Sequence, residues 1–166
     1  MAKKTAYMGV MLCLALILSY AEALIPINFG IPGIKLGITN ILIVLVLYLW
    51  GWKEAFLLSV LRVILVGFLF GNAFGILYSL AGALLSLFVM VLLKKLTTLK
   101  LISISVAGGI SHNLGQIIIA AVIVENINLF YYFPTLMISG IIMGFIIGII
   151  AGEIRIRTER LFIKED

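Results

Sequence analysis

Six long apolar stretches, separated by short polar or proline-containing breaks, make up most of this 166-residue chain. A helix needs about 20 apolar residues to cross the roughly 30 Å of hydrocarbon in a membrane. The breaks predict helices at residues 6–25, 36–50, 53–70, 73–93, 101–124 and 134–152, followed by an amphipathic tail at 153–166. We therefore expect an all-α integral membrane protein: one domain, a bundle of six transmembrane helices. The tail alternates charge with Ile and Leu, which favours a continuation of the last helix along the membrane surface.

The composition excludes several other classes of protein. Hydrophobic residues make up 64% of the chain and charged residues 11%, whereas soluble domains carry about a quarter charged residues. This balance disfavours a water-soluble enzyme and a disordered chain. The net charge is +5, but the basic residues flank the apolar stretches, so they indicate contact with anionic lipid and no nucleic-acid partner. The single cysteine, Cys13, excludes an intrachain disulfide.

The basic residues also predict the topology, because Lys and Arg beside short loops stay cytoplasmic. Lys35 falls on the opposite side from the others, and Arg62 lies inside a predicted helix. The remaining ten share one side: Lys3, Lys4, Lys53, Lys94, Lys95, Lys100, Arg155, Arg157, Arg160 and Lys164. We expect a multi-pass protein of the bacterial plasma membrane with both termini cytoplasmic. The N-terminus imitates a cleavable signal, but its long apolar run favours a retained helix.

Polar side chains inside the predicted helices are the candidate site, because such groups in hydrocarbon need a partner, a cavity or a ligand. Arg62 is predicted near the membrane midplane. The other members form one polar sector of residues 101–124, namely His112, Asn113 and Gln116. Together they would line a pocket that opens outward and suits an anionic or carbonyl-rich headgroup. Glu22, at the outer end of the first predicted helix, is a further candidate substrate-binding residue.

A structural explanation stays open for the same residues. Arg62 could pair with Glu22, at the outer end of the first predicted helix, or with helix carbonyls. His112 and Asn113 could then simply hold helices together. One histidine without a second histidine or cysteine partner does not make a metal site, and no cofactor is expected.

The segment 26–37 is apolar but contains two prolines and three glycines, so it cannot be a regular spanning helix. One interpretation is a re-entrant lid, with Lys35 and Asn40 capping the pocket. The other is an ordinary hydrophobic loop on the outer side.

Small residues at four-residue spacing indicate close helix packing, since lipid offers little drive for helix association. The last predicted helix carries the longest such stripe: Gly140, Gly144, Gly148 and Gly152. The first carries a second set, which could dock another membrane subunit: Gly9, Cys13, Ala15 and Ser19. Packing within the bundle and docking of a partner both remain open for these stripes.

Three motifs resemble one membrane family. They are Pro32-Gly33-Ile34-Lys35-Leu36-Gly37-Ile38-Thr39-Asn40, Leu61-Arg62-Val63 and Ser111-His112-Asn113-Leu114-Gly115-Gln116. These resemble the family labelled heptaprenyl diphosphate synthase component I, or Gx transporter, over nearly the whole chain. That family is similar to the S components of energy-coupling factor (ECF) transporters, which implies six helices, an outward pocket, a transmembrane coupling subunit and cytosolic ATPase subunits. It also implies that the small residues of the first helix contact the coupling subunit.

The sequence therefore favours a non-enzymatic subunit that binds a small or isoprenoid or quinone-like substrate. The alternative is a membrane anchor for a prenyl diphosphate synthase or a redox partner. Synthases of that kind hold magnesium with aspartate-rich motifs, and the sole aspartate here is the terminal Asp166. The chain also lacks a Gly-rich phosphate loop ending in Lys-Ser or Lys-Thr, so ATP-driven work would need other subunits.

Overall fold

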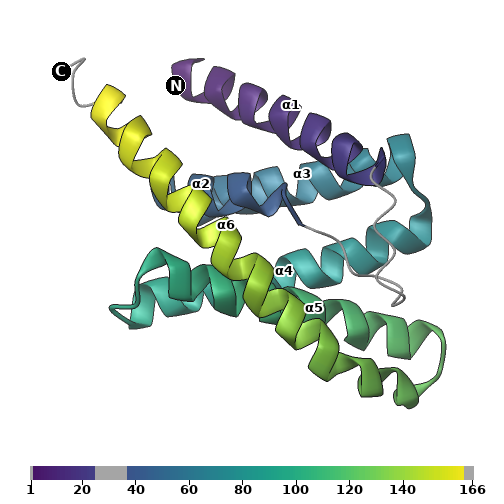
Figure 1. The fold of residues 1–166 in the computed structure, drawn as a ribbon. Coiled ribbons are helices and arrows are strands. Elements are labelled where there is room, and N and C mark those ends of the chain that lie inside the picture. The colour runs from purple at the N-terminus through teal and green to yellow at the C-terminus, as the bar shows by residue number, and fades with distance from the viewer. Residues whose placement is uncertain (1, 25–36, 163–166) are drawn as a thin grey trace.

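The computed structural model describes residues 2–24 and 37–162, and it places them almost entirely in helices (Figure 1). No strand occurs within these two ranges. The elements in chain order are α1 (Ala2–Leu24), α2 (Asn40–Leu49), α3 (Trp52–Phe70), α4 (Ala73–Leu96), α5 (Leu101–Ile123), the short 3-10 helix η1 (Ile127–Tyr132) and α6 (Phe133–Phe162). The predicted all-α class is confirmed.

Four stretches in the described residues are long and apolar enough to cross a membrane: Lys3–Leu24, Ala73–Leu96, Leu101–Ile123 and Ile127–Glu159. The other two helices fall short for different reasons. α2 has ten residues, about 15 Å of helix, which is half of a hydrocarbon layer. α3 has 19 residues but includes three charged ones, Lys53, Glu54 and Arg62. The predicted helices are thus present, while the count of six membrane crossings is not confirmed.

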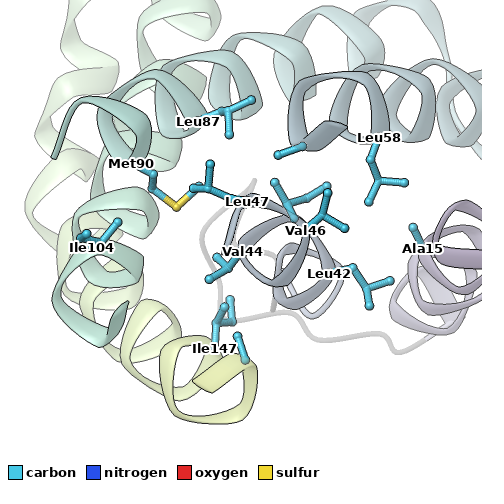
Figure 2. Close-up of a cluster of buried hydrophobic side chains, with 13 residues drawn as sticks. Ala15, Leu42, Val44, Val46, Leu47, Leu58, Leu87, Met90, Ile104 and Ile147 are labelled. Atoms are coloured by element: carbon cyan, nitrogen blue, oxygen red, sulfur yellow. The ribbon is translucent and has the colours of Figure 1, made fainter. Parts of the chain in front are cut away.

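α2 lies at the centre of the bundle. Every residue from Leu42 to Leu47 is at most 7% exposed, so this helix is buried on all sides. Its side chains point toward the surrounding helices, for example Leu47 toward Met90 of α4 and Val44 toward Ile147 of α6 (Figure 2). Six consecutive apolar residues leave this helix no polar face, which explains why it serves as the core.

Glycines bring α5 against its two neighbours. A Cβ atom at Gly109 would lie 2.3 Å from the carbonyl oxygen of Gly140 on α6, and one at Gly115 would lie 2.6 Å from the carbonyl oxygen of Ala81 on α4. Gly144 and Gly148 also pack against α5. Packing within the bundle is therefore confirmed for these three glycines of α6. Gly152, the last of that stripe, has no atom within 4 Å of its Cβ position.

Two predicted helix starts were wrong. The helix predicted at 36–50 begins at Asn40, because Gly37 has a φ of +65°, in the left-handed region that interrupts a right-handed helix. The first helix begins at Ala2 rather than at residue 6.

Two predicted helix ends were also too early. α4 continues to Leu96, since Lys94 and Lys95 sit favourably in a last turn, where cations complement the helix dipole. α6 runs on to Phe162, so the continuation predicted for the tail is confirmed as far as that residue. The extension carries the ion pairs Arg155 with Glu159 at 2.8 Å and Arg157 with Glu153 at 3.8 Å.

Candidate ligand-binding site

A cavity of about 40 Å³ lies where α2, α5 and α6 meet. α2 and the turn before it contribute Gly37 and Asn40. The residues from the other two helices are Gly109, His112, Asn113 and Gln116 of α5, and Ser139, Gly140, Met143, Gly144 and Ile147 of α6. Four residues predicted from the sequence therefore meet at one place: Asn40, His112, Asn113 and Gln116.

Glycines form part of the wall of this cavity. Gly109, Gly140 and Gly144 line it and let the backbones of α5 and α6 meet, since a Cβ atom at any of them would lie less than 3 Å from the backbone of the facing helix. On the opposite side of α5, a Cβ atom at Gly82 of α4 would lie 2.7 Å from Cγ of Gln116 and 3.0 Å from Nε2 of His112. Both polar side chains thus depend on a glycine in α4 for their position.

Gln116 is the most informative polar residue of the cavity. It is 3% exposed, it lines the cavity, and its amide forms no hydrogen bond within the described residues. An amide can donate two hydrogen bonds and accept two. No atom of Gln116 is among the fully buried polar atoms without a partner in the described chain, so its amide reaches the open space of the cavity. Gln116 therefore offers unused hydrogen-bonding capacity toward the cavity.

Asn113 has a structural role as well. Its Nδ2 donates a hydrogen bond of 2.6 Å to the carbonyl oxygen of Leu136. This bond joins α5 to the first turns of α6, as the structural explanation for Asn113 predicted. Its side chain still borders the cavity, so the two roles coexist.

Arg62 lies apart from the residues that line this cavity. Its Nε is buried and has no hydrogen-bond partner in the described chain, and Glu22 is the acidic residue that acts on it electrostatically. Glu22 Oε1 accepts a hydrogen bond of 2.6 Å from the backbone N–H of Gly37, which is part of the cavity wall. Glu22 thus contacts the cavity wall at Gly37 and is also the acidic group nearest in effect to Arg62, a connection that the sequence did not indicate.

Besides the bond from Gly37 to Glu22, a second hydrogen bond connects α1 to the turn before α2. The hydroxyl groups of Ser19 and Thr39 lie 3.0 Å apart in a buried hydrogen bond between α1 and the turn before α2. Thr39 is fully buried. Lys35, predicted to cap the pocket, lies outside the described residues, as does segment 26–36 of the predicted lid.

The four predicted docking residues of α1 face two ways. Gly9 and Cys13 are exposed, and no atom lies within 4 Å of the Cβ position of Gly9. Ala15 is fully buried and Ser19 is 9% exposed, so both pack inside the bundle. In this arrangement a partner could reach the first pair and not the second.

The size of the cavity limits what it can hold. A volume of 40 Å³ has room for about three water molecules, so it can take a small polar head but not a whole isoprenoid. Among the described residues, no group of three His, Cys, Asp or Glu is placed to hold a metal ion.

Several lining residues were not predicted as site members, among them Ser139, Met143 and Ile147. Gly140 and Gly144 were assigned to helix packing or to the docking of a partner, not to a cavity. Ser139 precedes a glycine of the stripe on α6, and that was the one available signal, because serine is enriched at close contacts between membrane helices.

The long apolar helices and the internal polar cavity define a multi-pass helical membrane protein. The chain belongs to the family described as heptaprenyl diphosphate synthase component I, whose sequence model matches residues 11–154. The resemblance noted from the motifs is therefore confirmed. No curated protein and no solved structure matches the chain.

Proposed function

We propose that this protein is a non-catalytic substrate-binding membrane subunit, similar to the S component of an ECF transporter, which takes up its substrate from the outer face. The observation that carries this proposal is Gln116, a buried amide that borders a cavity and has no hydrogen-bond partner in the described chain. Structural amides usually find a partner in the protein. An amide that keeps its capacity free is better explained by a ligand.

The chemistry of the wall favours a substrate with a carbonyl or hydroxyl head and an apolar body. Asn40, Asn113 and Gln116 contribute amides and His112 contributes an imidazole, so the wall contains both hydrogen-bond donors and acceptors. Met143 and Ile147 add apolar surface next to them. A quinone-like or isoprenoid-type molecule has this combination of groups.

Transport would require further subunits. The proposal includes a transmembrane coupling subunit and cytosolic ATPase subunits. The exposed face of α1 around Gly9 and Cys13 is the proposed contact. Ala15 and Ser19 would join that contact only if α1 moved away from the bundle.

Native mass spectrometry of the purified protein tests the binding role. We expect a stoichiometric small molecule on the wild type and its loss from Gln116→Leu, which keeps the side-chain volume but removes the amide. Ser103→Ala is the matched control, since Ser103 is an exposed polar residue of the same helix outside the cavity lining. Equal occupancy of wild type and Gln116→Leu would contradict the proposal.

Arg62→Ala sharpens this test. A binding subunit predicts weaker ligand retention with the fold intact, because Glu22 would no longer be balanced and the Gly37 wall would shift. A purely structural role predicts lower stability with retention unchanged in the fraction that folds.

The second candidate is an accessory membrane anchor for a prenyl diphosphate synthase, which the description of the family favours. It predicts that a soluble synthase co-purifies with the protein. It also predicts that the cavity variants change stability alone. A synthase retained equally by wild type and Gln116→Leu, with no small molecule bound, would favour the anchor.

A further inference from the structure

Cations lie over aromatic rings at the C-terminal end of α2, whereas the cavity lies at its N-terminal end. The Nζ of Lys94 lies 4.4 Å from the ring centroid of Tyr48, and the guanidinium carbon of Arg155 lies 5.0 Å from the same centroid. Lys94 comes from α4 and Arg155 from α6. Three helices therefore bring two positive charges to one ring.

The charges of this pair are only partly compensated. Lys94 is half-buried and donates a hydrogen bond of 2.7 Å to the carbonyl oxygen of Leu47, and no carboxylate in the described chain forms an ion pair with it. Arg155 uses its Nε for Glu159. Two like charges that act on each other in a partly desolvated place are unfavourable without an anion.

Further cations and rings extend the cluster. Lys53 and Lys95 lie 5.8 and 6.0 Å from the ring of Trp52, and both lysines are exposed. Space is also available on α6, since Gly152, one turn before Arg155, has no neighbour within 4 Å of its Cβ position. Tyr and Trp are typical of the headgroup level of a membrane.

We propose that Lys94 and Arg155, together with Tyr48, form a binding site for the phosphate group of an anionic membrane lipid. An ammonium and a guanidinium fork supply several donors to phosphate oxygens, and basic pockets between helices are known to hold lipid headgroups. This site is separate from the cavity, because Asn40 and Leu47 mark opposite ends of α2. It therefore does not depend on the substrate-binding proposal.

A simpler explanation accounts for part of the geometry. Lys94 could serve only to satisfy the last carbonyls of α2, with the ring contacts adding cation–π stabilisation. That explanation predicts that Lys94→Gln lowers stability but leaves lipid affinity unchanged. It leaves the mutual repulsion of Lys94 and Arg155 only partly compensated.

The test is binding of phosphatidylglycerol to the purified full chain, followed by native mass spectrometry with phosphatidylcholine as the zwitterionic reference. We expect Lys94→Gln and Arg155→Gln each to weaken phosphatidylglycerol binding about fivefold, since one basic residue near anionic lipid is worth about 1 kcal/mol. Arg157→Gln is the matched control, because Arg157 lies on the same helix and its side chain is 79% exposed. We expect that variant to change binding by less than about twofold.

Three results would overturn the proposal. The first is equal affinity of wild type, Lys94→Gln and Arg155→Gln. The second is an equal loss in the Arg157→Gln control, which would indicate a diffuse charge effect. The third is displacement of the lipid by millimolar inorganic phosphate, which would assign the site to a soluble phosphate compound. If Lys94→Gln does not fold, Arg155→Gln decides alone.

Discussion

α5 and α1 are attached to the protein in opposite ways. α5 meets α6 backbone to backbone through Gly109 and Gly140, and 33% of the residues in its span are buried. In α1 the buried share is 11%, and the helix lies along one side of the bundle against α3 (Figure 1). The contact between α5 and α6 leaves no room for an added atom, whereas the contact of α1 with the bundle depends on a few side chains.

This difference assigns the two regions different roles. The close contact between α5 and α6 forms a fixed frame, and the polar cavity lies along that contact. α1 reaches the frame through α2, by way of Ser19 and Thr39 and of Glu22 and Gly37. The cavity wall at Gly37 is therefore the part of the site that α1 contacts directly.

The largest expected effect is on the frame. Gly109→Ala places a methyl group 2.3 Å from a backbone carbonyl oxygen of α6, which no side-chain rotation relieves. We expect a loss of about 3 kcal/mol in the free energy of unfolding, the upper end for overpacking. Thermal unfolding in detergent measures it. Gly152→Ala is the control and should leave stability equal or raised, because alanine favours a helix and nothing is near. Equal stabilities of the two variants would contradict the close backbone contact between α5 and α6.

The attachment of α1 gives the next effect. Ala15→Leu enlarges a fully buried residue and should cost about 2 kcal/mol, whereas Cys13→Leu on the exposed face should change stability by less than about 0.5 kcal/mol. The same unfolding assay compares them. A larger loss for Cys13→Leu would mean that the helix is rotated from the orientation described here.

The hydrogen bond between α1 and the turn before α2 should contribute less. Ser19→Ala removes one partner of a buried hydroxyl pair and should cost about 1 kcal/mol. A double-mutant cycle with Thr39→Val isolates the interaction. A coupling energy of zero would show that the hydroxyls do not hold the two segments together.

The smallest effect is expected at the surface. Lys4 pairs with Glu54 of α3, but the lysine side chain is 49% exposed. Lys4→Gln should therefore change stability by less than about 0.5 kcal/mol, and added salt should not alter that result. A loss above 1 kcal/mol would indicate that α1 depends on this pair more than on its buried residues.

The sequence predicted the parts that follow from local pattern. Apolar length predicted the helices, and the spacing of Gly140, Gly144 and Gly148 predicted a close helix contact, since both are properties of one helix. The polar sector of His112, Asn113 and Gln116 was visible for the same reason.

The contacts between different helices could not be predicted from such local patterns. Arg62 was predicted to line the same pocket as His112, but its predicted depth near the midplane does not fix the rotation of α3 about its axis. α2 looked like a short membrane crossing, while its all-round burial depends on five other helices. The hydrogen bond of Gly37 to Glu22 could not be predicted either, because it depends on Gly37 lying next to the end of α1.

The most direct test of the central claim is an experimental density map of the protein purified from its native membrane. We expect non-protein density in the cavity between α2, α5 and α6, with a polar atom of the ligand in hydrogen-bond distance of the Gln116 amide. A cavity of unchanged volume that holds only water would contradict the binding role.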